Sequence, residues 1–326
     1  MMIDFISATK HLQGEDSIFL GHLQQEASYS TGWKKYLMQG CKNLAIWHNE
    51  ANSVMRIEGS FAYFVQGHNF NFDNSQFVEA GQYIGGLLET NIFDFEIDIF
   101  EFGKMIQVED KPKNYILNHR ENPKQGLIQY DNPKDKGNFR RWESPEIRLK
   151  MYDASRNILH KQGMKMKDII QESGWNPEGN TLKIEAYYKK PHLILNGGRR
   201  IKLGDLVNPN WQKRISEDLY YQYKKLIPLG MIEQPNNKKD LSTQDLLMIA
   251  LAEGATQGGK TLIEVKKMLY DRINAIPDEI LSPTDKKARK RQILALIGKI
   301  HTSPQSKWDL SDKLKEALSL KEQENT

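Results

Sequence analysis

The sequence predicts an α+β fold, in which a central, mostly antiparallel sheet with covering helices is followed by an all-helical C-terminal part. Two observations support this prediction. Short segments with period-two alternation lie in the first two thirds of the chain, and from about residue 212 the apolar residues recur with helical spacing. We place the boundary in the segment VNPNWQ, which gives an α+β domain over residues 1–206 and a helical, basic domain over residues 207–326.

Apolar and polar residues alternate in four segments of the first domain, as expected where one face of a strand is buried. These segments are SVMRIEG (53–59), FDFEIDIFEF (93–102), EIRLKMYD (146–153) and TLKIEAYYKK (181–190). A further strand is expected over 43–47. Helices are expected over 76–89, where three glycines weaken the helical pattern, and over 164–174.

Residues 254–261, GATQGGKT, match the phosphate-binding pattern G-x-x-x-x-G-K-[ST]. That motif requires a buried strand before it, but the preceding LSTQDLLMIALAE has a helix cap and helical apolar spacing. Gly254 is expected to end this helix in a left-handed conformation, and Thr261 begins the next helix with a capping box. About 65 residues remain after the pattern, roughly half of a nucleotide-binding domain. We therefore interpret the segment as helix, glycine turn, helix.

The composition excludes several classes of protein. The single cysteine, Cys41, rules out an internal disulfide and a cysteine-rich zinc site. No stretch approaches the ~18 apolar residues of a membrane span, and MMIDFISATK lacks the pattern of a secretion signal. We therefore expect a cytoplasmic protein without a membrane partner.

The positive charge lies in the C-terminal part. Residues 206–326 contain 20 Lys and Arg against 16 Asp and Glu, whereas the remaining residues of the chain are balanced. The densest part, KKARKR, comprises Lys286, Lys287, Arg289, Lys290 and Arg291. The run is expected to begin a helix whose apolar residues (Ile293, Leu294, Leu296 and Ile297) pack on the helical domain. Its cations then either contact DNA phosphates or form a solvated helix face.

Two strands carry acidic residues on their polar faces. FDFEIDIFEF places Asp98 opposite its apolar face, and TLKIEAYYKK does the same with Glu185. Carboxylates on adjacent strands repel each other unless a cation lies between them, and Mg²⁺ or Mn²⁺ prefers oxygen ligands. The alternative is that both are ordinary solvent-facing residues.

A tyrosine lies between cations on one face of the segment EIRLKMYDASRN, where Arg148, Lys150 and Tyr152 share the polar side. This arrangement suits a nucleophile that attacks a phosphodiester, because cations lower the pKa of the phenol and bind the anionic backbone. The alternative is a half-exposed strand tyrosine with no chemical role.

A histidine follows an apolar run at the turn Gly67-His68-Asn69. An imidazole at this position is a candidate metal ligand or acid/base group. The alternative is a structural histidine.

Together these segments resemble a known family. RIEGSFAYFVQGHNFNFD resembles the segment ending in Q-G-H-N of the gene-two and gene-X type replication initiators of filamentous phages, and FEIDIFEF is similar to their following strand. EIRLKMYDASRN and TLKIEAYYKK are similar, in order and spacing, to the tyrosine-bearing and glutamate-bearing strands of that family. They are also similar to rolling-circle plasmid initiators. The resemblance covers roughly residues 50–200.

The resemblance implies a rolling-circle nuclease fold and an endonuclease that nicks one strand of origin DNA in the host bacterial cytoplasm. Tyr152 would hold the 5′ phosphate covalently, and His68 would assist. Asp98 and Glu185 would bind Mg²⁺ or Mn²⁺. A host helicase and polymerase would be partners. Arg148, Lys150 and the KKARKR run would contact DNA.

The sequence departs from the family in ways that leave alternatives open. The chain has no His-apolar-His pair, so His119 and His160 compete with His68 as a third metal ligand. Tyr187 and Tyr188 are rival nucleophiles. A DNA-binding regulator is the alternative function, with helices over 243–253 and 262–275 as a helix-turn-helix, although the intervening turn is longer than usual. A phosphate-loop ATPase is a further, weaker alternative.

Overall fold

The computed structural model describes residues 3–13, 20–38, 43–69, 72–122, 125–131, 133–157, 179–228, 251, 254, 262–298 and 308–320. The helices expected over 164–174 and 243–253 lie outside this part of the chain, apart from Leu251. Of GATQGGKT, only Gly254 is described. Its backbone is helical, so the expected left-handed helix end at this glycine is wrong.

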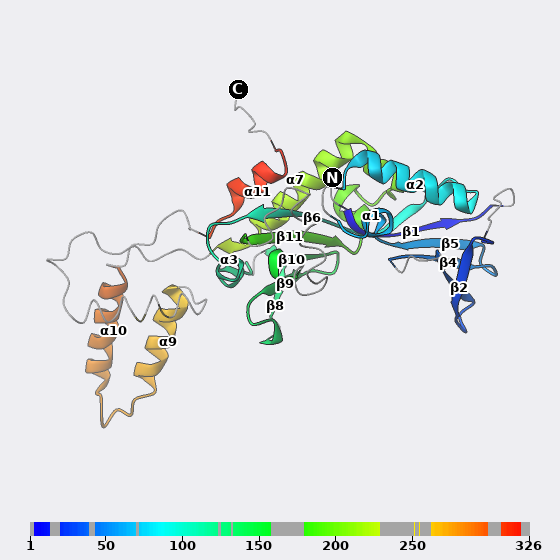
Figure 1. Ribbon diagram of the computed structural model, residues 1–326. Coiled ribbons are helices and arrows are strands. Elements are labelled where there is room, and N and C mark those ends of the chain that lie inside the picture. The colour runs from blue at the N-terminus through cyan, green and yellow to red at the C-terminus, as the bar shows by residue number, and fades with distance from the viewer. Residues whose placement is uncertain are drawn as a thin grey trace.

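Ten strands form one antiparallel sheet in the order β2-β3-β4-β5-β1-β6-β11-β10-β9-β8 (Figure 1). They are β1 (Ile3–His11), β2 (Leu23–Ser28), β3 (Trp33–Met38), β4 (Leu44–Asn49), β5 (Val54–Gly59), β6 (Glu96–Gln107), β8 (Ile128–Tyr130), β9 (Phe139–Glu143), β10 (Ile147–Asp153) and β11 (Thr181–Tyr188). All five expected strands are present. Asp94 lies outside them, because a 3-10 turn, η1 (Ile92–Asp94), precedes β6. The antiparallel α+β fold class is thereby confirmed.

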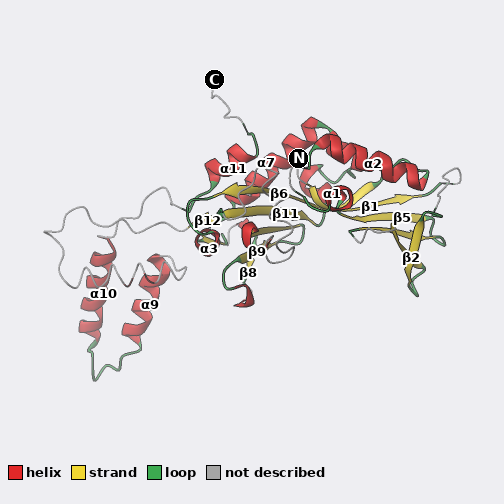
Figure 2. Cartoon of the chain, viewed as in Figure 1, coloured by secondary structure: helices red, strands yellow, loops and turns green. Residues whose placement is uncertain are grey.

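The helices that pack against this sheet are α1 (Phe61–Gln66), α2 (Asn74–Leu88), α3 (Pro112–Leu117), α6 (Pro191–Leu195), α7 (Pro209–Lys224) and α11 (Ser311–Ala317), with the 3-10 turn η4 (Leu203–Val207). Among them, α2, α7 and α11 cover one face of the sheet (Figure 2). Strand side chains that face them, such as Ile57, Phe100 and Ile184, are fully buried. The core of the molecule therefore lies between the sheet and this helical layer.

The expected helix over 76–89 is present as α2, and one of its glycines, Gly81, has a packing role. Asp73 caps the helix, because its carboxylate accepts hydrogen bonds at the first turn and Gln76 completes a capping box. A Cβ at Gly81 would lie 2.4 Å from Cζ of Phe93. The absent side chain therefore lets the Phe93 ring pack directly on the helix backbone.

The expected boundary at 207–212 does not separate two cores. Helix α7 begins there, but Ile215 and Leu219 pack on the sheet, and Leu310 and Leu314 return the C-terminal segment to the same cluster. Helices α9 (Leu262–Asn274) and α10 (Pro283–Gly298) instead pack on each other as a hairpin. The described part of the chain has no helix that is both long and apolar enough to span a membrane.

A second, two-stranded sheet joins β7 (His119–Arg120) to β12 (Ile227–Pro228) beside the C-terminal segment. Tyr223 connects these parts, since its hydroxyl contacts Asp309 at 3.1 Å and accepts a hydrogen bond from the backbone N–H of Leu310 at 2.6 Å. The side chain of Trp308 packs edge-on against Tyr115. The last described segment is thus fixed to the body of the molecule.

Candidate active site

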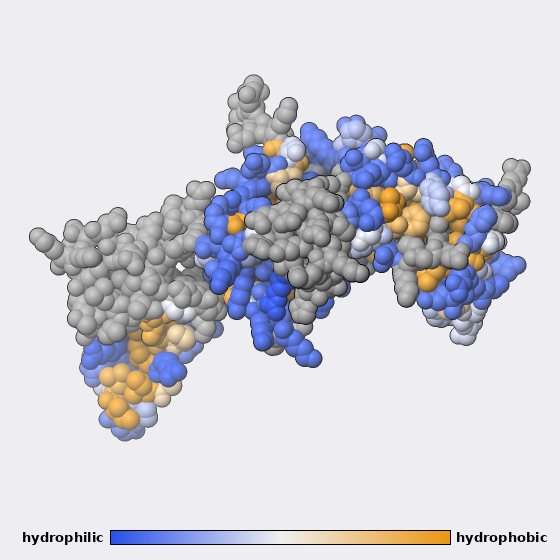
Figure 3. All heavy atoms as spheres, in the orientation of Figure 1, coloured by the Kyte–Doolittle hydropathy of each residue, from blue (hydrophilic) through white to orange (hydrophobic). Residues whose placement is uncertain are grey.

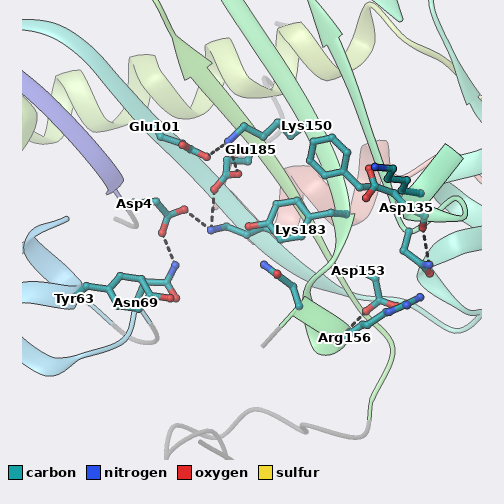
Figure 4. A pocket seen from close by; sticks show the side chains of 15 residues that line it. Asp4, Tyr63, Asn69, Glu101, Asp135, Lys150, Asp153, Arg156, Lys183 and Glu185 are labelled. Carbon is teal, nitrogen blue, oxygen red and sulfur yellow. Dashed lines mark hydrogen bonds and ion pairs between the residues drawn. The ribbon is translucent and has the colours of Figure 1, made fainter. Parts of the chain in front are cut away.

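A cavity of about 800 Å³ lies on the face of the sheet opposite α2 and α7. Side chains from β1, β6, β10 and β11 form its floor, and residues 134–139 and 153–157 form one side. Tyr63 and Asn69, from the α1 region, lie at the other side (Figure 4).

The strand register determines which side chains meet in the cavity. Tyr152 of β10 lies opposite Lys183 of β11, and Lys150 lies opposite Glu185. Glu185 in turn lies opposite Gly103 of β6. A Cβ at Gly103 would be only 3.1 Å from Cε of Lys183 and from Cβ of Glu185, so this glycine makes room for both side chains.

The floor of the cavity is a buried network of two ammonium groups and three carboxyl groups. Lys183 contacts Asp4 and, at 3.0 Å, Oε1 of Glu185, and Lys150 contacts Glu101 and, at 3.2 Å, Oε2 of Glu185. Glu185 is 3% exposed and Lys183 is 2% exposed. Glu185 therefore joins the two halves of the network, and it is not the solvent-facing residue of the alternative interpretation.

The three carboxyl groups differ in their affinity for protons. Burial raises the pKa of Asp4 to about 7 despite the opposing charge of Lys183. Burial and contact with Glu185 raise the pKa of Glu101 to about 9. Burial acts to raise the pKa of Glu185 too, but the charges of Lys183 and Lys150 and hydrogen bonds from the other carboxyl groups hold it well below its usual value. Glu185 thus remains ionised when Glu101 carries a proton.

Tyr152 lies beside this network with its ring 5.9 Å from Nζ of Lys183. Burial raises the pKa of its phenol well above 10, and the charge of Lys183 only partly offsets this effect. The expectation that neighbouring cations leave the tyrosine with a lowered pKa is therefore wrong for this state. Arg148 does not contribute, because it lies over Tyr187 and pairs with Glu143 at 2.6 Å.

Asp98 and Glu185 are not brought together. Asp98 lies at a bulge of β6, where it accepts a hydrogen bond from Thr9 at 2.5 Å and lies 3.7 Å from Arg200. It is five positions from Gly103, the partner of Glu185, or roughly 15 Å along the strand. Glu101 occupies the position beside Glu185 that the sequence interpretation gave to Asp98.

Glu101 and Glu185 are the two residues that could hold the expected divalent ion. Glu101 and Glu185 supply oxygen atoms from adjacent strands, and both contact the ammonium group of Lys150, so the pair already accommodates a cation. The described residues contain no group of three His, Cys, Asp or Glu side chains that forms a complete metal site. This is compatible with Mg²⁺, which commonly takes one or two carboxylates together with substrate phosphate and water.

The Q-G-H-N segment contributes its asparagine to the cavity. Asn69 donates a hydrogen bond to Asp4 at 2.6 Å. His68 is not among the lining residues; its Nδ1 lies 3.2 Å from Nε2 of Gln66, and burial lowers its pKa. The structure thus places His68 next to the site but brings Asn69 into it.

The competing histidines have other positions. His119 is fully buried, with Nδ1 2.8 Å from the carbonyl of Tyr115 and Nε2 2.9 Å from the hydroxyl of Tyr223. Because both ring nitrogens have protein partners, this histidine is a structural residue and not a metal ligand. His160 lies outside the described residues.

The rival tyrosines differ from Tyr152. Tyr188 is fully buried on the helix-covered face, where it stacks on Phe100 and donates a hydrogen bond to Asp218 at 2.8 Å. Tyr187 shares the face of Tyr152, but it does not line the cavity. Of the three tyrosines, Tyr152 is therefore the best placed to act as a nucleophile in the cavity.

The basic run lies within α10, as expected for a helix. Lys286 pairs with Asp278 at 2.6 Å, and Lys290 donates to Asn274 at 2.5 Å, so these two cations hold the hairpin together. Lys287, Arg289 and Arg291 are exposed. Hydrophobic side chains gather on the visible face of the hairpin (Figure 3), and Leu294 is 52% exposed. The expectation that Leu294 packs in a helical core is wrong.

Sequence reasoning missed Asp4, Glu101 and Asn69. Asp4 lies at the start of a strand that was not expected, and its distance from the tyrosine segment in the chain concealed the contact. Glu101 falls within the expected strand, but only the register with β11 shows that it lies closer to Glu185 than Asp98 does. The Q-G-H-N pattern was a signal for Asn69.

Comparisons of the chain with family models, curated proteins and solved structures found no match.

Proposed function

We propose that the chain is a DNA strand-nicking and rejoining enzyme of the rolling-circle initiator type, with Tyr152 as nucleophile. The observation that carries the proposal is the position of Tyr152 in a cavity that also contains Lys183, Lys150 and three carboxyl groups, of which Glu185 contacts both Asp4 and Glu101. Such a site offers a nucleophile, cations for a phosphate and proton acceptors in one place.

In the cleavage step, the phenol oxygen of Tyr152 attacks the phosphorus of the scissile phosphodiester. A bond forms between phosphorus and the phenol oxygen, and the bond between phosphorus and O3′ breaks. The products are a 5′-phosphotyrosine and a strand that ends in a 3′ hydroxyl, with the proton for O3′ drawn from solvent. Lys183 and Lys150 stabilise the negative charge on the phosphate oxygens.

The phenol proton must leave during this step, because burial keeps Tyr152 protonated at neutral pH. Asp4 is our candidate acceptor, since it lines the same cavity as Tyr152 and burial raises its pKa to about 7. Asn69 and Lys183 fix the orientation of its carboxylate.

Rejoining reverses the same chemistry. A 3′ hydroxyl attacks the phosphotyrosine, the bond between phosphorus and O3′ forms again, and Tyr152 leaves as the phenol. The covalent bond conserves the energy of the phosphodiester, so the reaction needs no nucleotide cofactor.

Glu101 and Glu185 would hold the expected Mg²⁺ or Mn²⁺ ion. When bound, such an ion would polarise the scissile phosphate. Asp98 is no longer part of the proposed ligand set.

The test uses a supercoiled plasmid that carries the origin of the replicon encoding the chain, with Mg²⁺ or Mn²⁺. We expect nicked plasmid with protein attached at the 5′ end, and mass spectrometry of the trapped adduct should identify the peptide with Tyr152. Tyr152→Phe should abolish the adduct, whereas Tyr187→Phe, the matched control on the same face, should retain it. Binding without nicking by the wild type would refute the proposal and favour a DNA-binding regulator.

A further inference from the structure

The face of the sheet that contains the cavity extends well beyond it. Residues paired directly across strands share a face, and Lys35, Trp47 and Arg56 are paired in this way through β3, β4 and β5. Arg56 is also paired with Thr9 of β1, and Phe5, further along the same side of β1, is paired with Glu101 in the cavity. The strands β3 to β5 therefore continue the side of the sheet on which the cavity lies. We call this whole side of the sheet the cavity face.

Two tryptophan rings on this extension each carry a cation. The guanidinium of Arg56 lies 5.0 Å from the ring centre of Trp33, and Nζ of Lys35 lies 5.6 Å from that of Trp47. Tyr29, 47% exposed, lies 5.5 Å from Trp47. These rings lie on the side opposite α2, where they are at least partly accessible to solvent.

The same combination recurs within and beyond the cavity. Arg148 lies 5.2 Å from the ring centre of Tyr187, which in turn stacks on Phe5 at 6.3 Å. Lys183 lies over Tyr152 in the cavity itself.

At the far side of the cavity, Arg141 lies 5.3 Å from the ring centre of Tyr130. Tyr130 is 44% exposed and is paired with Arg141, which is paired with Lys150. The cavity thus has aromatic–cation pairs on both sides. The span from β3, which carries Trp33, to β8, which carries Tyr130, covers eight strand spacings, or roughly 38 Å.

We propose that the cavity face is a binding track for single-stranded DNA, on which Trp33 and Trp47 receive bases on one side of the cavity and Tyr130 on the other. This inference rests on the proposed function, because the strand that reaches Tyr152 must continue in both directions. Bases stack on aromatic rings without regard to sequence, while the adjacent cations neutralise the backbone. Duplex DNA cannot use the track in this way, because its bases already stack on each other.

The test measures the affinity of the full chain for a fluorescein-labelled 20-nucleotide oligo(dT) by anisotropy. EDTA is present to prevent cleavage, so the assay reports binding alone. Trp47→Leu and Tyr130→Leu should each weaken binding roughly 5- to 150-fold. Tyr83→Leu is the matched control, since Tyr83 is 59% exposed on α2, on the opposite side of the sheet. Circular dichroism and thermal melting establish that each variant is folded.

Binding to a 20-base-pair duplex should be the same for all three variants. The track is refuted if Trp47→Leu and Tyr130→Leu bind oligo(dT) as tightly as Tyr83→Leu does, or if they lose equal affinity for oligo(dT) and duplex. Because this assay needs no cleavage, it is independent of the adduct experiment. An adduct on a residue other than Tyr152 would refute the proposed function without affecting the track. Unchanged oligo(dT) affinity in the variants would refute the track without affecting the proposed function.

Discussion

The carboxyl groups of β6 show that the register of one strand determines which side chains can act together in the cavity. Asp98 and Glu101 lie three residues apart in β6, yet one pairs with Thr9 and Arg200 and the other joins the network of Lys150 and Glu185. Simple alternation would place them on opposite faces of the strand, but the bulge at Asp98 shifts the pattern, so both lie on the same face. Of the two, only Glu101 forms a hydrogen bond with Glu185.

The revised ligand pair makes a direct prediction. Glu101→Gln should raise the Mg²⁺ concentration needed for half-maximal nicking by roughly 10- to 100-fold, because a neutral amide is a poorer ligand than a carboxylate. Asp98→Asn, the matched control on the same strand, should leave that concentration unchanged. A Mg²⁺ titration of plasmid nicking measures both variants. The opposite pattern, with only Asp98→Asn impaired, would return Asp98 to the ligand set.

At the scale of elements, helix α2 and the buried junction at His119 show two ways in which the body is held together. Glycine weakened the sequence prediction of α2, but the structure uses Gly81 to admit the ring of Phe93. At the junction, His119 joins the end of α3 to α7 through Tyr223. In both cases one small group determines how two elements approach each other.

Two of the glycines of α2, Gly81 and Gly86, should respond differently to replacement by alanine. Gly81→Ala should lower the free energy of unfolding by roughly 1–3 kcal/mol, because the added Cβ overlaps the Phe93 ring. Gly86→Ala should raise it by about 0.4–1 kcal/mol, since nothing lies within 4 Å of its Cβ position. Urea denaturation of the two variants gives both values. Equal effects would show that Phe93 moves aside without cost.

His119 should make stability depend on pH. Burial lowers its pKa to about 4 in the folded state, whereas the unfolded chain binds a proton near pH 6.5. Above about pH 6.5, the neutral His119 side chain does not reduce the free energy of unfolding. As the pH falls towards 4, the unfolded chain binds a proton that the folded chain does not, and the free energy of unfolding decreases by roughly 3 kcal/mol in all. Denaturation of wild type and His119→Gln between pH 4 and 7.5 should show a smaller slope for the variant. Parallel curves would exclude His119 as the source.

Sequence patterns identified the local elements much better than their contacts. Alternation located β10 and β11 and placed Tyr152 and Lys150 on one face, because both properties depend on neighbours within one segment. It gave no register between distant strands, so the meeting of Asp4 with Lys183, 179 positions away, was not predictable. Burial was also hidden: a polar strand residue such as Glu185 is assumed to face water until the surrounding loops are known.

At the scale of the whole molecule, helices α2, α7 and α11 lie on one side of the sheet (Figure 1), and the strand side chains that line the cavity project from the other. The basic run stands apart from both, on the α9–α10 hairpin. Its exposed cations, Lys287, Arg289 and Arg291, lie outside the cavity, where they are suited to phosphate contacts.

The hairpin should supply salt-dependent binding to duplex DNA. Replacing Lys287, Arg289 and Arg291 with Gln should weaken binding to origin and random duplex about equally, and it should flatten the slope of log K against log salt by roughly one unit per lost contact. Lys286→Gln, which removes a cation already paired with Asp278, should change the slope less. Fluorescence anisotropy at several salt concentrations measures this. An unchanged slope in the triple variant would identify the run as a solvated face.

The bond between Tyr223 and Leu310 has a consequence for how the chain is divided. Residues on either side of the hairpin meet within hydrogen-bonding distance, so the chain leaves the body and re-enters it at nearly the same place. In chain order, the α9–α10 hairpin therefore lies between two segments of one continuous body. Its replacement by a short linker would leave the order and register of all ten strands intact. The cavity, and with it the chemistry proposed for Tyr152, would therefore keep its geometry without this appendage.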